Sequence, residues 1–102
     1  MIKNTPQEPD NKQIELILAL FKTRKFEEAK NAINNLTIKF PNSSILYNIF
    51  GAILVKENQL VLAIEQYEKS IRLKPNYAEA YNNLGIALEK LNKYRDAIEK
   101  FE

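Results

Sequence analysis

Apolar residues recur along this chain three and four positions apart, in segments that short polar breaks separate. One segment has apolar residues at Tyr81, Leu84 and Leu88, and the pattern resumes at Tyr94 after the break KLNK. This spacing puts the apolar side chains on one face of a helix. Helices are expected to end at KTRK, KENQ and KLNK, and at the proline-containing FPNSS and KPNYA. The pattern predicts helices near residues 11–23, 26–39, 45–57, 60–73 and 79–91, and a last helix from residue 94 onward.

The chain also repeats itself with a period of 34 residues, and a period of this size identifies repeat architectures. Three kinds of residue keep the period, namely Gly51 and Gly85, Pro41 and Pro75, and Ala29, Ala63 and Ala97. We therefore expect a flexible amino-terminal segment at residues 1–9, a degenerate first repeat at 10–43, a second repeat at 44–77 and a third at 78–102. Each repeat holds two helices, and the third repeat is truncated in its second helix.

The repeat resembles the tetratricopeptide repeat, whose signature is an aromatic residue, Leu-Gly, a large apolar residue, and then Ala, an aromatic and Pro at fixed offsets. The second copy matches at Tyr47, Phe50, Gly51, Leu54, Ala63, Tyr67 and Pro75, and the third at Tyr81, Leu84, Gly85, Leu88, Ala97 and Phe101. The first copy departs from the signature, with Gln13 and Ile17 where the aromatic and the glycine are expected. The resemblance implies an all-α fold, a right-handed α-solenoid of antiparallel helix pairs. At the small positions, Gly51, Gly85, Ala63 and Ala97, paired helices are expected to approach closely.

The segment SILYNIFGAILV, Ser44 to Val55, is apolar on nearly every side but too short to span a membrane. In the family, the first helix of a repeat packs on its own second helix and on the preceding repeat, and its third side lines a concave groove. The resemblance assigns to this groove Ile45, Ile49 and Val55, together with Ile14, Leu18 and Phe21 of the first copy. The remaining expected binding residues are Asn48, Asn82, Asn83 and Ile86, with the asparagines as polar contacts.

A helix that is apolar all round is expected to be covered all round. The sequence leaves three coverings open: the groove side chains contact one another or the amino-terminal segment, a protein partner supplies an amphipathic helix or extended peptide, or a second copy binds. Self-association through an uncapped carboxy-terminal end at Phe101 is also open. A clamp for acidic peptide tails, known in the family, is not expected, because its positions hold Ile14, Leu18, Ile49, Glu79 and Asn83.

Composition narrows the classes of function. The chain has no cysteine and no histidine, which excludes disulfides, thiolate metal sites and histidine-based catalysis. Fifteen Lys and Arg against 13 Asp and Glu leave a net charge of +2 with the signs interspersed, which does not favour nucleic acid. The first residues lack the apolar core of a signal peptide. We therefore expect no catalytic residue, metal or cofactor, no membrane contact, and a cytoplasmic location.

The sequence thus predicts a protein–protein interaction module that binds a peptide or an amphipathic helix in an apolar groove. Because the third repeat stops early, we also expect the chain to be the amino-terminal part of a longer protein. Two alternative functions stay open at this point. One is an accessory repeat domain of a larger enzyme, such as a transferase, and the other is a homo-oligomerisation module.

Overall fold

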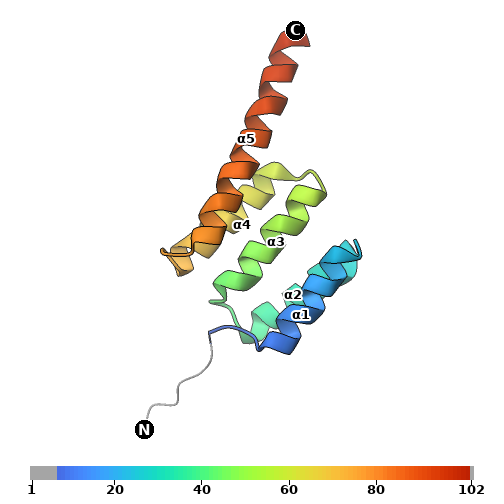
Figure 1. Ribbon diagram of the computed structural model, residues 1–102, viewed down its shortest axis with the longest axis vertical. Coiled ribbons are helices and arrows are strands. Elements are labelled where there is room, and N and C mark those ends of the chain that lie inside the picture. Colours follow the sequence, from blue (N-terminus) through green and yellow to red (C-terminus); the bar gives the residue numbers. More distant parts are fainter. Residues whose placement is uncertain (1–6, 102) are drawn as a thin grey trace.

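The computed structural model describes residues 7–101, the last of them as backbone only, and this range forms helices without any strand. In chain order the helices are α1 (Asn11–Lys22), α2 (Phe26–Lys39), α3 (Ser44–Lys56), α4 (Leu60–Leu73) and α5 (Ala78–Phe101). The helices α1, α3 and the first half of α5 form one layer, and α2 and α4 lie behind it (Figure 1). The all-α fold is confirmed, while the segment predicted to be flexible, residues 1–9, lies mostly outside the described residues.

The turns inside the first two helix pairs share one geometry. Arg24 and Asn58 occupy the same position of the 34-residue period, and both adopt the left-handed conformation, with φ of 61° and 62°. The next residue, Lys25 or Gln59, donates its N–H to the carbonyl five positions earlier, at 2.9 and 2.8 Å. This pattern satisfies a carbonyl that the end of the helix would otherwise leave without a partner. It also reverses the chain, so the second helix packs antiparallel to the first.

The start of α3 is held by an unusually complete cap. Ser43 Oγ accepts a hydrogen bond from the Leu46 N–H at 3.1 Å and donates one to the carboxylate of Glu8. The same carboxylate accepts from the Ser44 N–H at 3.1 Å and from Ser44 Oγ at 2.9 Å. A negative charge at a helix amino terminus is favourable because it meets free N–H groups and the positive end of the helix dipole. Glu8 therefore anchors residues 7–10, which precede α1, to the turn between α2 and α3.

Two apolar clusters hold the helices together. The first joins α1 and α2 to α3, and its buried members are Ile17, Ala29, Ile33, Leu46, Ile49 and Ile53. The second joins α3 to α4 and α5, and its buried members are Leu54, Ala63, Tyr67 and Ala87. Phe50 packs against both clusters. Leu46 and Ile53 thus meet the preceding helix pair, and Leu54 meets its own second helix.

The last helix departs from the sequence prediction. A break is predicted after residue 91, but α5 runs through KLNK without interruption, and Asn92, the counterpart of Arg24 and Asn58, is helical. The prediction of a separate helix from residue 94 onward is therefore wrong. A left-handed conformation is costly for a residue with a side chain, and packing of the second helix offsets that cost in the first two pairs. Here the side chains from Asn92 to Lys100 are all exposed, so local helix propensity decides.

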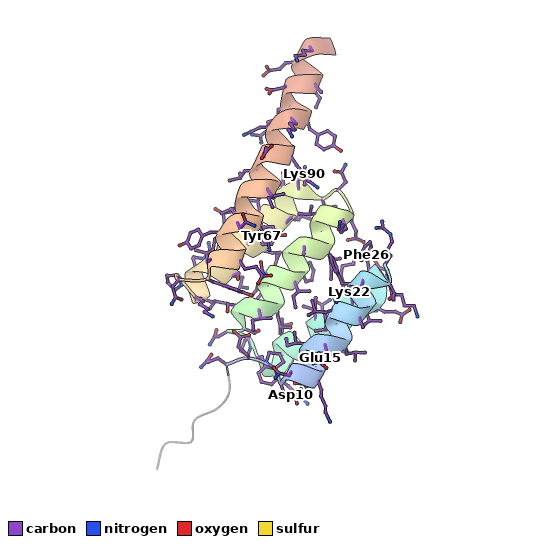
Figure 2. The ribbon with its side chains drawn as sticks, in the orientation of Figure 1. Asp10, Glu15, Lys22, Phe26, Tyr67 and Lys90 are labelled. Carbon is purple, nitrogen blue, oxygen red and sulfur yellow. The ribbon has the colours of Figure 1, made fainter. Side chains whose placement is uncertain are left out.

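The close approach expected at the small residues occurs in α3 but not in α5. A Cβ built on Gly51 would lie 2.5 Å from Cε1 of Tyr67, so glycine is needed for α4 to pack there. A Cβ built on Gly85 would meet nothing within 4 Å, and Ala97 is exposed. Figure 2 shows the second half of α5 standing clear of the other helices. The expectation fails at Gly85 and Ala97 because no helix lies against α5 on that side within the described residues.

Candidate functional site

The predicted groove residues lie on the three helices of one layer. They are Ile14, Leu18 and Phe21 on α1, Ile45, Asn48, Ile49 and Val55 on α3, and Asn82, Asn83 and Ile86 on α5. The fold therefore brings residues from all three copies of the repeat to the layer formed by α1, α3 and the first half of α5 (Figure 1). We call the surface of this layer that carries the predicted groove residues the front face.

The apolar candidates on α1 and the first part of α3 are used largely inside the protein. Ile14, Leu18, Phe21 and Ile45 are partly buried and pack against the first cluster. Ile49 belongs to that cluster and is only 7% exposed, so it offers almost no surface to a ligand. The contact among groove side chains that the sequence leaves open is therefore present in part. Leu18, Phe21 and Ile45 each stay partly exposed.

Val55 lies with a different set of neighbours. It is partly buried against the second cluster, beside residues of α4 and α5, whereas Ile45 packs against the first. The predicted stripe on α3 is thus divided between two clusters and is not one continuous apolar floor. The division arises because α3 is the central helix, and each of its sides meets a different neighbour.

Asn48 is the centre of a polar connection between α3 and α5. Its amide oxygen accepts a hydrogen bond from Asn83 Nδ2 at 3.0 Å, and its Nδ2 donates to the Tyr77 hydroxyl and to Glu79 Oε1, each at 3.4 Å. Only 3% of Asn48 is exposed. A buried amide that is fully hydrogen-bonded stabilises one arrangement of its neighbours. Asn48 and Asn83 therefore act first as a link between the second and third copies of the repeat.

Burial and charge shape the chemistry of Tyr77. Burial raises the pKa of its phenol and the nearby Glu79 carboxylate raises it further, while the hydrogen bond from Asn48 works in the opposite direction. The phenol is therefore protonated at neutral pH and keeps its O–H as a donor.

The first half of α5 provides the open part of the front face. Asn82 is exposed, and Ile86 is 45% exposed, the largest apolar opening among the predicted groove residues. Asn83, one residue on, is half-buried through its bond to Asn48. Among the predicted groove residues, those on α1 and α3 are therefore half-buried or buried, and the two exposed ones, Asn82 and Ile86, lie on α5.

Sequence reasoning gave no role to Tyr77. This residue stands 34 positions after Ser43, the residue that caps α3, and so occupies the capping position before α5. A tyrosine there reaches across to Asn48 where the serine in the earlier copy caps its own helix. Comparing the copies at their capping positions would have singled out Tyr77, because serine and tyrosine differ so much in length.

Comparisons with known proteins agree on one kind of repeat. A family profile described as TPR repeat matches residues 51–92. A chloroplastic tetratricopeptide repeat domain-containing protein of Arabidopsis thaliana is 40% identical over 57 residues, which is 56% of this chain and 19% of the relative. The peroxisomal targeting signal receptor of Candida albicans is 36% identical over 59 residues, 58% of this chain and 10% of the receptor.

A third relative extends the match over more of the chain. The Hsp70-Hsp90 organizing protein of Triticum aestivum is 32% identical over 69 residues, which is 68% of this chain and 12% of that protein. The chain thus spans about a fifth or less of the length of these relatives. Among the helices described here, none has the length and apolar character needed to cross a membrane.

Proposed function

Because the chain belongs to the tetratricopeptide repeat family, we propose that it is a protein-binding module whose front face holds a peptide or an amphipathic helix of a partner. The observation that carries this proposal is the combination on the front face of half-buried apolar side chains with the exposed Asn82 and Ile86. Two relatives are named as a targeting signal receptor and as an organizing protein, and such names fit a module that binds other proteins. The proposal assigns the chain no catalytic role of its own.

The chemistry of the front face favours a ligand with apolar anchors. Leu18, Phe21 and Ile45 keep exposed edges beside the first cluster, and Ile86 stands on the far side of the face. A fully buried large apolar side chain contributes about 1.5–3 kcal/mol, so completing the burial of four half-buried ones gives a few kcal/mol before association costs. Asn82 supplies hydrogen bonds to a peptide backbone or a polar side chain. A helix with apolar residues three and four apart matches this surface.

A displayed library of random peptides is the probe we would use. Peptides selected on the 102-residue chain are expected to carry apolar residues at helical spacing, with dissociation constants in the micromolar range. Ile86→Glu places a charge in the contact and should weaken the selected peptide about tenfold or more, measured by fluorescence anisotropy. Ile38→Glu is the matched control, because Ile38 is 81% exposed on α2, outside the front face.

Two results would reject the front face as the binding surface. One is a selected peptide that binds Ile86→Glu as tightly as the unchanged chain, and the other is selection that never rises above background. Circular dichroism of each variant must match that of the parent, since a loss of helix would reduce binding at any site. Ile49→Glu is unsuitable here, because the buried side chain belongs to the first cluster and a charge there would unfold it.

The cytoplasmic location stays a prediction from the sequence. One relative is named as chloroplastic, so the family is not confined to the cytoplasm. Fractionation of the cells that make the protein, followed by detection with an antibody against this chain, measures the location directly. Recovery in an organelle fraction would overturn the prediction.

A further inference from the structure

One side of α5 carries an apolar stripe that continues beyond the packed part of the protein. Its members are spaced three and four residues apart, at Leu84, Ala87, Leu91, Tyr94 and Ile98. At about 100° per residue, these five side chains fall within a sector of about 80° around the helix. Ala87 is buried in the second cluster and Leu84 packs against it. We call these five residues the α5 stripe, and its first part is already an interface with α3 and α4.

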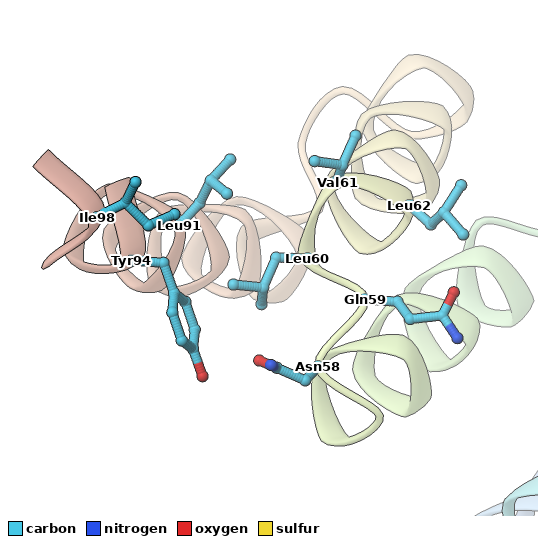
Figure 3. Close-up of a pocket in the computed structure, with 8 residues that line it drawn as sticks. All are labelled: Asn58, Gln59, Leu60, Val61, Leu62, Leu91, Tyr94 and Ile98. Atoms are coloured by element: carbon cyan, nitrogen blue, oxygen red, sulfur yellow. The ribbon is translucent and has the colours of Figure 1, made fainter. Parts of the chain in front are cut away.

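The outer part of the α5 stripe faces the start of α4 across a cleft. Leu91, Tyr94 and Ile98 line this cleft, whose volume is about 460 Å³. Leu60 projects toward it from α4, and Tyr94 extends toward Asn58 on its other side (Figure 3). The stripe therefore leaves the packed part of the protein beside an apolar surface of a second helix. An apolar side chain placed in the cleft contacts both helices.

Large apolar side chains are strongly exposed around this cleft. Val61 is 56% exposed, Leu62 45%, Tyr94 51% and Ile98 59%. They are four of the nine large apolar side chains with such exposure in the part of the chain that the structure describes. Exposed apolar side chains that are grouped in this way are characteristic of interaction surfaces, whereas isolated ones are ordinary. The cleft therefore has the character of a docking surface.

The charged residues beside the cleft are basic. Tyr94 and Asn58 also line a second cleft, of about 400 Å³, and Lys90 and Lys93 lie along it. Among the described residues, no Asp or Glu lines either cleft. Lys93 forms an ion pair with Glu89 at 3.1 Å, but both side chains are exposed and such a pair contributes little. Acidic side chains of a ligand can therefore meet these lysines while its apolar side chains enter the first cleft.

We propose that the cleft between α4 and the second half of α5 docks an amphipathic helix of a partner protein, with acidic residues beside its apolar stripe. The occupant is a helix because the α5 stripe has the spacing with which helices pack on one another, and its first part already packs in this way. The acidic flank follows from Lys90 and Lys93, since a basic helix would meet like charges there.

This site is separate from the proposed peptide site on the front face. Asn82 and Ile86 lie in the first half of α5, whereas Tyr94 and Ile98 lie in its second half. None of the predicted groove residues lines the cleft. The inference therefore goes beyond the proposed function, and the failure of either proposal leaves the other intact.

A displayed library of helical peptides tests the docking surface. Its peptides carry apolar residues three and four apart, with Glu or Lys allowed at the flanking positions. The library is first depleted on Ile98→Glu, which removes peptides that bind elsewhere, and is then selected on the 102-residue chain. The selected peptides are expected to carry Glu beside the apolar stripe. By fluorescence anisotropy, Ile98→Glu should weaken them about tenfold or more, because it places a charge in the apolar contact.

Two variants serve as matched controls for Ile98→Glu. Ile86→Glu changes the front face and Ile38→Glu changes the exposed side of α2, so both should bind the selected peptide like the parent chain. Ile98 is 59% exposed, so its substitution should leave the fold intact, and circular dichroism checks this. A peptide that binds Ile98→Glu as tightly as the parent, or a selection that never rises above background, would overturn the proposal.

Reversing the charge on both partners tests the acidic flank. The double variant Lys90→Glu, Lys93→Glu should weaken the selected peptide, and a peptide with every Glu replaced by Lys should bind this variant more tightly than the parent chain. Selected peptides without a preference for Glu would overturn the proposal, as would the absence of this reversal. Light scattering on the parent chain alone covers the remaining occupant. A dimer that Ile98→Glu dissolves would overturn the proposal and assign the cleft to a second copy.

Discussion

At the scale of single residues, Gly51 and Gly85 occupy the same position of the repeat, but the same substitution should change stability in opposite directions at the two sites. Gly51→Ala should destabilise the protein by about 1–3 kcal/mol, because the added Cβ overlaps the buried ring of Tyr67. Gly85→Ala should stabilise the monomer by about 0.5–1 kcal/mol, the gain of alanine over glycine in an open helix. Urea denaturation at low micromolar concentration measures both. Equal midpoints for the two variants would show that the ring moves aside without cost.

Tyr67 gives the protein a dependence on alkaline pH. Burial raises the pKa of this phenol from its ordinary value of 10 to about 12, and Glu79 adds to the shift. The folded state therefore favours the protonated phenol, whose contribution to stability is complete below pH 10 and is lost as the pH rises from 10 to about 12. Urea denaturation at several pH values should show this decline in the parent chain.

The matched comparison is between two Tyr→Phe variants. Tyr67→Phe removes the buried phenol and should flatten the decline, whereas Tyr94→Phe removes an exposed one and should leave the decline as it is. Identical profiles for the parent chain and Tyr67→Phe would assign the alkaline loss to other groups.

At the scale of helices, α3 depends on its cap. Ser43 is fully buried, accepts from the Leu46 N–H and donates to Glu8, so Ser43→Ala leaves the Leu46 N–H without its cap and removes one of the three hydrogen bonds to the Glu8 carboxylate. We expect a loss of about 1–2 kcal/mol in the free energy of unfolding. Thr23→Ala is the control, since the Thr23 hydroxyl is exposed at the end of α1 and its removal should change stability by less than about 0.5 kcal/mol. Equal effects would show that the cap contributes nothing specific to α3.

Helix boundaries were predictable where the local sequence and the packing of a neighbouring helix favour the same boundary. They were not predictable where no helix packs, as in the second half of α5. The sequence predicts the first four helices to within one residue at each end, because polar breaks and the turns at Arg24 and Asn58 coincide. KLNK stands at the same position of the period and also begins with Lys, but its residues are compatible with a helix, and only packing of a second helix would select the turn. Because the local signal is ambiguous, the sequence alone could not decide whether residues 78–101 form one helix or two.

The candidate site was predictable at the level of helices and less so at the level of side chains. The 34-residue period correctly brings α1, α3 and α5 into one layer. It does not show that Ile49 is 7% exposed or that the amide of Asn48 is bound to Asn83 and Tyr77. Helical periodicity predicts the side of the helix on which a residue lies, but not how deeply its side chain is buried. The burial of Ile49 depends on how closely α1 approaches α3.

At the scale of the whole molecule, the chain is an elongated stack in which each helix pair contacts its neighbours. Its principal extents are 62, 29 and 19 Å, and its apolar side chains gather in two clusters along the stack. In such stacks stability is the sum of the units and of the interfaces between them. The side chain of Phe50 packs against both clusters, so it is where the two halves of the stack are coupled most directly.

Phe50→Ala should therefore weaken the coupling between the two halves as well as the overall stability. We expect a loss of about 3 kcal/mol in the free energy of unfolding, typical of an aromatic side chain removed from a packed region. Native-state hydrogen exchange should show the amides of α1 and α2 opening at a lower free energy than those of α4, whereas in the parent chain the two sets open together.

Leu36→Ala is the control that separates the loss of coupling between the two halves from the loss of buried side-chain volume. Leu36 packs against the first cluster alone. That variant should lower stability while the amides of α1, α2 and α4 still exchange through a common opening. A uniform decrease in Phe50→Ala would mean that α3, as one continuous helix with a side in each cluster, couples the halves without help from this side chain. Separate openings would place the coupling in side-chain packing, and a ligand that bridges α1 and α5 on the front face would then stiffen the whole stack.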